Sequence, residues 1–318
     1  MKVLILGGAG FLGSNLVRRC LSEKSCQVTV LDSLDPLMHS NTQNLQEVWP
    51  KIRFIRGDIR NETLLAEVVQ NQDVIFSCAA QTSHSLSIQY PLLDAEINCL
   101  GNLKILEAVR LLNKDAIIVY TSTSTVIGKL NKTVADEQHP ERPVEIYSAN
   151  KGVAEKYFQI YNMHYDLNTI VLRLPNLYGP FGKNYSEFGF INYFINLAWA
   201  NQQIKIFGKG EQTRNIMYVD DATDILWKVA NESRLIGNMY FATGTEHLTV
   251  REIAEMIVGV FQKGSVINVD WPDERRRIEI GSVNLSSAKL RAIVDWEPRY
   301  DLKSGLQQIK LVFEQNDF

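Results

Sequence analysis

The sequence lacks the features that mark several classes of protein. Its four cysteines, Cys20, Cys26, Cys78 and Cys99, show no metal-ligand spacing, so we expect no metal site and reduced thiols in the cytoplasm. The formal net charge is only −3 and no long basic stretch is present, which argues against nucleic acid or a membrane surface as partner. No apolar run is long enough to span a bilayer. Because Met1 leads directly into a strand-like segment, we also expect no signal peptide.

What is present is a regular alternation of strand-like and helix-like segments in the first half of the chain. The apolar, strand-like segments are Val3–Leu6, Val28–Asp32, Ile52–Asp58, Asp73–Ala80, Ala116–Ser122 and Thr169–Leu174. Amphipathic segments lie between them, at Leu64–Val69, Ala95–Leu112 and Tyr147–His164. Continuous apolar strands that alternate with helices indicate an α/β fold with a doubly wound parallel sheet, covered on both faces. In such folds, ligands bind beyond the carboxyl ends of the strands.

The pattern changes after Leu174. A turn-rich stretch at Pro175–Asn184 is followed by helical patterns, among them Val250–Phe261 and Leu302–Glu314, and by short strands. These segments predict a smaller C-terminal α/β lobe that closes over the strand ends. We therefore expect a first domain at residues 1–174, rejoined by about residues 215–245, and a substrate lobe at residues 175–214 and 246–318.

A glycine-rich turn follows the first predicted strand. GGAGFLG, at Gly7–Gly13, opens a helix, so backbone N–H groups can approach a pyrophosphate without interference from Cβ atoms. Asp32 ends the second strand, where a carboxylate binds the hydroxyls of an adenosine ribose. Because Asp32 repels a 2′-phosphate and no Arg follows it nearby, NAD is predicted as the cofactor rather than NADP. Asp58, after the third strand, either contacts the adenine or caps the next helix.

The fifth predicted strand ends in a run of hydroxyl side chains, Thr121–Thr125. Thr favours strands and Ser favours turns, so the run alone has a structural explanation. However, the helix that follows begins with YSANK, which places Tyr147 and Lys151 on the same helical face. A Tyr has a pKa of about 10, and a nearby ammonium and a nicotinamide cation both favour the phenolate that a base needs. We therefore predict that the hydroxyl run and this pair meet where a substrate hydroxyl is oxidised.

In this order, the motifs resemble the extended short-chain dehydrogenase/reductase family, in its nucleotide-sugar epimerase/dehydratase branch. The resemblance is carried by Gly7–Gly13, Asp32, Asp58, Ala79–Gln81, Asn98–Asn102, Thr121–Thr125, Tyr147–Lys151, Leu172–Pro180 and Arg214–Asp221. It implies a Rossmann-like sheet, bound NAD, a nucleotide-diphosphate sugar as substrate, and a homodimer formed through the helices at residues 95–112 and 147–164. Cys78, Asn215 and Ile127 depart from the common pattern of the family, which leaves the identity of the substrate open.

The resemblance also implies roles for individual residues. The implied catalytic residues are Thr123, Tyr147 and Lys151. The implied cofactor-binding residues are Gly7, Gly10, Phe11, Leu12, Gly13, Asp32, Asp58, Ile59, Ala79, Ala80, Asn98, Tyr147 and Lys151. The implied substrate-binding residues are Thr82, Ser122, Thr123, Asn176, Arg214 and Arg276, with Arg275 as an alternative to Arg276. Asn176 is also explained as a turn residue and Arg275–Arg277 as a solvated face, and His84 is interpreted as a polar loop residue rather than as an acid.

The two positions after Thr123 bear on the reaction. Dehydratases of the family carry an Asp-Glu pair there, and decarboxylases keep a Glu at the second position, whereas this chain has Ser124 and Thr125. Because neither hydroxyl replaces a carboxylate as acid or base, the sequence predicts an epimerase that acts at C4 through a transient 4-keto intermediate. The alternatives are a nucleotide 4-ketosugar reductase, then a 4,6-dehydratase or decarboxylase, and last a non-catalytic NAD-binding protein.

Overall fold

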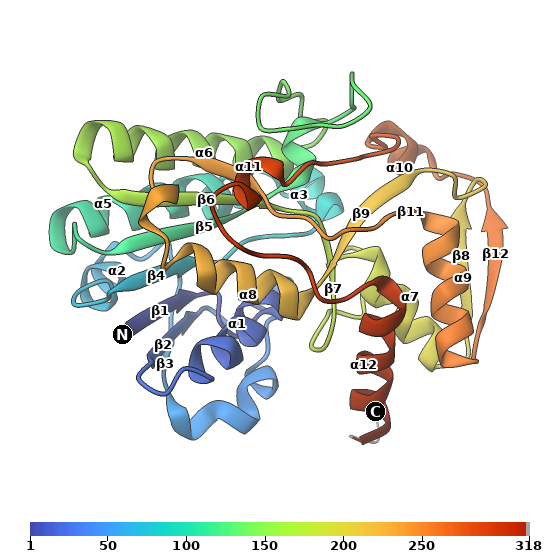
Figure 1. The fold of residues 1–318 in the computed structure, drawn as a ribbon, viewed down its shortest axis with the longest axis horizontal. Coiled ribbons are helices and arrows are strands. Elements are labelled where there is room, and N and C mark those ends of the chain that lie inside the picture. Colours follow the sequence, from blue (N-terminus) through green and yellow to red (C-terminus); the bar gives the residue numbers. More distant parts are fainter. Residues whose placement is uncertain (316–318) are drawn as a thin grey trace.

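A parallel sheet forms the centre of the computed structural model, which describes residues 1–315 (Figure 1). Within these residues its seven strands are β1 (Lys2–Leu6), β2 (Gln27–Asp32), β3 (Ile52–Arg56), β4 (Val74–Ser77), β5 (Ile117–Thr123), β6 (Asn168–Leu174) and β10 (Met239–Phe241). Their order is β10-β6-β5-β4-β1-β2-β3, and neighbouring strands are parallel. The winding reverses between β1 and β4, and a ligand crevice opens at such a point. The predicted doubly wound, Rossmann-like sheet is confirmed.

Alternating side chains explain why helices cover both faces of this sheet. In β1, Val3 and Ile5 belong to one hydrophobic cluster, whereas Leu4 and Leu6 belong to another. The first cluster includes residues of α1 (Phe11–Leu21) and α8 (Val219–Val229). The second includes residues of α2 (Glu62–Val68), α5 (Asn102–Leu112) and α6 (Ile146–Tyr165). Figure 1 accordingly shows α5 and α6 on one side of the sheet and α1 and α8 on the other.

The helix predicted at Ala95–Leu112 is not a uniform α-helix. The short α4 (Pro91–Asp94) continues into a π-helical segment, Ala95–Gly101, which then becomes α5. A π-helical turn shifts the side chains that follow it relative to a regular helix, and such turns often occur beside functional sites. Here the segment packs against α6, which carries the Tyr–Lys pair.

Most segments after β6 build the smaller lobe, at the right of Figure 1, whereas α8 and β10 belong to the central sheet and its cover. Its elements are β7 (Asn176–Tyr178), α7 (Phe190–Trp199), β8 (Gln203–Phe207), β9 (Thr213–Tyr218), β11 (His247–Thr249), α9 (Val250–Phe261), β12 (Ser265–Val269), α10 (Asp273–Arg277) and α12 (Leu302–Gln315). β8 pairs with β12, and β9 lies between β7 and β11. α7, α9 and α12 enclose a hydrophobic core of their own with β8 and β9. A capping box formed by Thr249 and Glu252 begins α9.

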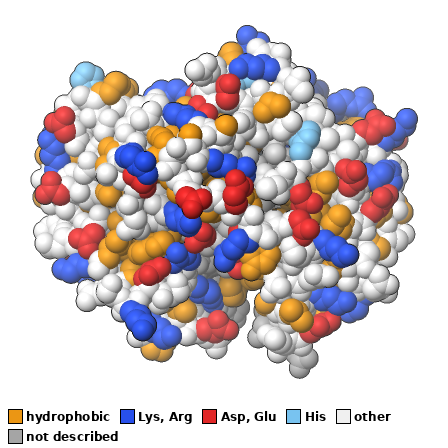
Figure 2. All heavy atoms as spheres, viewed as in Figure 1, with side chains coloured by type: hydrophobic (Ala, Val, Ile, Leu, Met, Phe, Trp, Pro, Cys, Tyr) orange, Lys and Arg blue, Asp and Glu red, His pale blue; other side chains and the backbone are white. Residues whose placement is uncertain are grey.

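Shorter elements complete the chain. They are the 3₁₀-helical turns Pro36–Met38, Thr42–Lys51, Ser124–Ile127 and Ser233–Leu235, together with α3 (His84–Gln89) and α11 (Ala288–Arg291). None of the helices within residues 1–315 has the length and apolarity needed to cross a bilayer. On the face in Figure 2, acidic and basic side chains are interspersed and form no patch of one sign.

Candidate active site

A cavity opens at the carboxyl ends of β1 and β4, and the glycine turn forms part of its wall. Gly7 has a φ of +82°, and a Cβ there would lie 2.6 Å from the backbone of Ala79. A Cβ on Gly13 would lie 2.2 Å from the carbonyl oxygen of Gly7. Both positions therefore require glycine, and the turn brings the N-terminus of α1 to the cavity with its backbone exposed.

Asp32 lies at the end of β2, beside this turn, and its carboxylate is held by the protein. Its Oδ2 accepts a hydrogen bond from the Ala9 N–H at 2.9 Å, and its Oδ1 accepts from the Leu34 N–H at 2.9 Å and the Ser40 hydroxyl at 2.8 Å. These bonds fix the carboxylate at the cavity wall. Nearby, Asp58 is bound by Arg60, whose hydrogen bonds and charge outweigh the effect of burial and lower the pKa of Asp58.

Most of the residues that the sequence singled out line this cavity. They are Gly7, Gly10, Phe11, Leu12, Gly13, Asp32, Asp58, Ile59, Ala79, Ala80, Thr82, Ser122, Thr123, Tyr147, Lys151 and Asn176. Residues more than a hundred positions apart in the chain thus share one site. Asn98, Arg214 and Arg276 lie elsewhere.

Tyr147 and Lys151 point from the first turns of α6 toward the end of β5, and both are buried. The Lys151 ammonium donates to the Thr121 carbonyl at 2.6 Å and lies 4.3 Å from the centre of the Tyr120 ring. Burial lowers the pKa of Lys151 to about 8. Burial, and then the charge of Glu145, raise the pKa of Tyr147, which a hydrogen bond with Thr123 partly offsets. Phenolate formation therefore needs added positive charge near Tyr147.

The hydroxyl run divides into two groups. Thr121 donates to the Ser77 carbonyl at 2.9 Å and Ser122 donates to Glu155 at 2.5 Å, so both hydroxyls are engaged by the protein although both residues line the cavity. Thr123 accepts from the Thr125 N–H at 3.2 Å, which caps the turn that follows, and lines the cavity. The run therefore contributes both to the structure of the strand end and to the wall of the cavity.

Ser122, predicted to bind the substrate, lines the first cavity, and its hydroxyl is already engaged by a buried carboxylate. Its acceptor, Glu155, is fully buried and also binds the Arg173 guanidinium at 2.6 Å. Arg173 in turn contacts Glu141. A buried charge pair costs much free energy to disrupt, so this hydroxyl is part of the support beneath β5 and not a free donor for a sugar.

Asn98 is another residue predicted to bind the cofactor. It lies in the π-helical segment, fully buried, and does not line the cavity. Its amide donates to the Gln81 carbonyl at 2.8 Å and to Asp94 at 3.0 Å. Asp94 also accepts from Asn150 of α6 at 2.7 Å. Asn98 therefore supports the wall formed by the segment after β4.

A second cavity adjoins the first and lies against the smaller lobe. The guanidinium of Arg214 lines it and is already paired, with Glu279 at 2.8 Å and the Gly281 carbonyl at 2.6 Å. Arg275 of α10 lines the same cavity. Arg276 instead lines a separate depression with Lys129 and Trp271, because consecutive residues of a helix point in different directions. The structure thus favours Arg275, the alternative, over Arg276.

The two cavities share a junction. It is lined by His84, Ser124, Thr125, Asn176, Gly189 and Phe190. His84 is the first residue of α3 and lines both cavities, so its interpretation as a polar loop residue was wrong. Its Nδ1 contacts the carboxylate of Glu145, which directly precedes α6. Glu145 was not predicted as a site residue, although it stands two positions before Tyr147.

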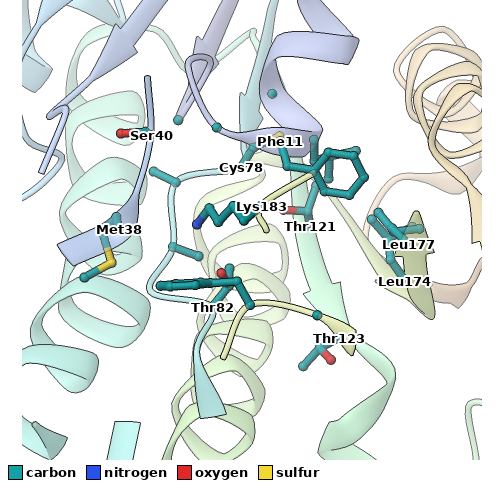
Figure 3. Close-up of a pocket in the computed structure, with 18 of the residues that line it drawn as sticks. Phe11, Met38, Ser40, Cys78, Thr82, Thr121, Thr123, Leu174, Leu177 and Lys183 are labelled. Carbon is teal, nitrogen blue, oxygen red and sulfur yellow. The ribbon is translucent and has the colours of Figure 1, made fainter. Parts of the chain in front are cut away.

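Lys183 is a further residue that the sequence analysis did not identify. It lies in the segment between β7 and α7, and its side chain extends into the middle of the first cavity (Figure 3). Burial lowers the pKa of Lys183 to about 8, although the charge of Asp32 opposes the change. The Phe188 ring lies 4.0 Å from its ammonium. The sequence offered no stronger signal than one basic residue in a turn-rich stretch.

A glycine turn and a carboxylate at the switch point of a doubly wound sheet, with a buried Tyr–Lys pair nearby, define the architecture of a nicotinamide dinucleotide-dependent enzyme. The chain belongs to the NAD dependent epimerase/dehydratase family, whose sequence profile matches residues 3–240. NAD is the cofactor of this family. The turn fits it, because the missing Cβ atoms at Gly7 and Gly13 leave room for a pyrophosphate against the backbone.

Relatives in this family differ in activity. The chain is 33% identical over 311 residues to a protein of Methanocaldococcus jannaschii named putative UDP-glucose 4-epimerase, with 96% of each chain covered. It is 30% identical to dTDP-glucose 4,6-dehydratase of Streptomyces niveus, with 96% of this chain and 90% of the relative covered. The crystal structure of Thermus thermophilus UDP-glucose 4-epimerase with NAD superposes with a TM-score of 0.88, at 27% identity, over 99% of this chain and 100% of the other.

Proposed function

We propose that the protein is an NAD-dependent nucleotide-sugar epimerase that acts at C4 through a transient 4-keto sugar. One observation carries this proposal: Thr123, Tyr147 and Lys151 line the first cavity together, and the positions after Thr123 hold Ser124 and Thr125, which line both cavities. The site thus has groups for oxidising and reducing a carbinol but lacks the carboxylate pair of a dehydratase at that place. The relatives named as UDP-glucose 4-epimerases support the same assignment.

The protein's own residues divide the work of oxidation. Tyr147 removes the proton of the sugar 4-hydroxyl, and Lys151 stabilises the phenolate by its charge. Thr123 donates a hydrogen bond to the sugar oxygen as it becomes a carbonyl. NAD, held by the glycine turn and Asp32, would supply the acceptor and donor of the C4 hydride. Tyr147 then gives the proton back, so that no net oxidation occurs.

The two cavities receive different parts of the ligands. The glycine turn, Asp32 and Asp58 hold the cofactor in the first cavity. Arg214 binds the substrate diphosphate in the second, because a guanidinium suits phosphate oxygens, and Arg275 adds positive charge there. Asn176 and Thr82 lie beside the sugar. The smaller lobe thus selects the nucleotide and the first domain carries out the redox chemistry.

The decisive experiment is incubation of the protein and NAD with a panel of nucleotide sugars, followed by mass spectrometry and NMR of the sugar ring. A C4 epimer has the same mass as its substrate and differs from it in the proton–proton couplings at C4 of the ring. Loss of water would identify a dehydratase, and a gain of two hydrogens with consumption of NADH would identify a ketosugar reductase. Release of a 4-keto-6-deoxy sugar would overturn the argument from Ser124 and Thr125.

We also propose that the protein forms a homodimer through α5 and α6. Ile146, Val153 and Ile160 follow one another at intervals of seven along α6, and about two fifths of each residue is exposed. Such a stripe suits packing against a second pair of helices. Sedimentation of the purified protein tests the proposal, and a monomer at micromolar concentration would contradict it.

A further inference from the structure

His84 and Glu145 form a pair that the redox mechanism does not use. Nδ1 of His84 contacts Oε1 of Glu145, and the Glu145 side chain is 3% exposed. The second carboxylate oxygen, Oε2, is buried and has no hydrogen-bond partner within residues 1–315. A buried carboxylate against one imidazole nitrogen fixes the orientation of the ring, as in other carboxylate-backed histidines.

The other nitrogen of the ring is available to a ligand. In the described part of the chain, Nε2 of His84 has no hydrogen-bond partner, and 37% of the side chain is exposed. His84 lines both cavities, and its ring meets the Tyr147 ring edge-on with 5.2 Å between the centres. A sugar whose C4 lies at Tyr147 therefore presents neighbouring ring atoms to His84.

A line of hydroxyls connects this pair with Thr123. The Ser148 hydroxyl donates to Oε1 of Glu145 at 2.8 Å and lies 2.6 Å from the Thr125 hydroxyl. The Thr125 hydroxyl is 3.0 Å from that of Thr123. Thr123 and His84 are thus joined by one network that runs through Thr125, Ser148 and Glu145. The absence of a carboxylate at Ser124 and Thr125 is offset by one that comes from the start of α6.

We infer that His84, positioned by Glu145, is a second acid–base group that removes and returns the proton on a carbon next to the sugar carbonyl. The inference rests on the proposed function, because a 4-keto nucleotide sugar is its substrate. It adds an activity, exchange of a carbon-bound hydrogen with solvent, to the transfer of hydride at C4.

The step balances without an oxidant or a reductant. Neutral His84 takes the proton at Nε2, the C–H electron pair forms the C=C bond of an enolate, and the carbonyl π pair moves to oxygen. The resulting negative charge faces the hydroxyls of Thr123 and Tyr147. The imidazolium, stabilised by Glu145, exchanges its proton with water. It then returns a proton to the same carbon, which restores the ketone.

The test supplies a 4-keto-6-deoxy nucleotide sugar to the NAD-loaded protein in D₂O and follows loss of the C3 and C5 proton signals by NMR. The unaltered protein should exchange one of these protons above the rate without protein. His84→Asn should reduce this rate by about 100-fold or more, the usual contribution of a general base. His247→Asn is the matched control, because His247 is exposed on β11 and lines neither cavity, and it should exchange at the unaltered rate.

Glu145 is tested as a positioning residue by two substitutions. Glu145→Gln should lower the exchange rate by about tenfold or more, whereas Glu145→Asp, which keeps the carboxylate, should restore part of it. Thermal unfolding and NAD binding of each variant verify that it is folded. Equal exchange by the Gln and Asp variants would show that the carboxylate has no such role and would overturn this part of the inference.

The outcomes separate this inference from the proposed function. If the protein exchanges the proton but does not interconvert C4 epimers, the epimerase proposal fails and the role inferred for His84 stands. A protein that interconverts epimers but shows no exchange above background overturns it. Exchange by His84→Asn at the unaltered rate would also overturn it, since the base would then be another group.

Discussion

The two cavities are built in different ways. The first rests on backbone: seven consecutive residues, Gly7–Gly13, form its turn, and the adjoining strand ends add short side chains. The second is made of side chains from separate elements, including Phe190 of α7, Arg214 of β9 and Arg275 of α10. Backbone shape constrains sequence locally, whereas a side-chain pocket depends on how distant elements pack. The first cavity can therefore be recognised in the sequence from one local motif, whereas single residues such as Arg214 give the second cavity no such motif.

The largest effect is expected from Tyr147→Phe, which removes the proposed base in the first cavity. Turnover should fall by about a thousandfold or more, because the proton acceptor and a positioned hydrogen bond are lost together. NAD affinity should change little, since the ring remains to fill its buried place. Single-turnover kinetics with the identified substrate give the measurement. Activity above about a tenth of the unaltered value would remove Tyr147 from its role.

The glycines of the two regions offer a direct contrast. Gly13→Ala places a methyl group 2.2 Å from the carbonyl oxygen of Gly7, within the turn. We expect a loss of about 1–3 kcal/mol in unfolding free energy and NAD binding weakened by about tenfold or more. Gly259→Ala in α9 is the control, because a Cβ there meets nothing within 4 Å.

That control should stabilise the protein by about 0.5–1 kcal/mol, the cost of glycine within a helix, and leave NAD affinity unchanged. Chemical denaturation and calorimetric titration measure both quantities. If Gly13→Ala bound NAD as tightly as Gly259→Ala did, the backbone of the turn would not be the binding site for the NAD pyrophosphate.

In the second cavity we expect the opposite selectivity, in which binding of the nucleotide sugar changes and binding of NAD does not. Arg214→Ala should weaken binding of the nucleotide sugar by about 10- to 100-fold, the value of charged hydrogen bonds, and leave NAD binding nearly unchanged. Glu279→Gln is the informative partner, because it releases the guanidinium from its 2.8 Å ion pair. It should bind the nucleotide sugar as tightly as the unaltered protein or more tightly. Equal losses in the two variants would make the pair structural.

The same contrast explains how much the sequence could predict. Strands β1 to β6 were predicted with ends close to those observed, because a buried parallel strand is a continuous apolar run. The three-residue strands β7, β10 and β11 were not predicted individually, since so short a segment has no period to detect. Among site residues, Lys183 and Glu145 were not predicted, for another reason. Their significance arises only when a loop of the smaller lobe and the start of α6 meet the strand ends.

The smallest effect should distinguish two neighbours in α10. Arg275 lines the second cavity, whereas Arg276 lines the separate depression beside Lys129. Arg275 is partly exposed, so its contribution to phosphate binding is screened by solvent and amounts to about 1 kcal/mol at most. Arg275→Ala should therefore raise the KM for the nucleotide sugar by up to about fivefold, and more at low salt than at high salt. Arg276→Ala removes the same charge one residue away and should leave KM within about twofold. Since both substitutions change the net charge equally, a long-range attraction of the substrate would affect them alike, and only a local contact would separate them. A larger effect of Arg276→Ala would mean that α10 turns its other side to the substrate when it binds.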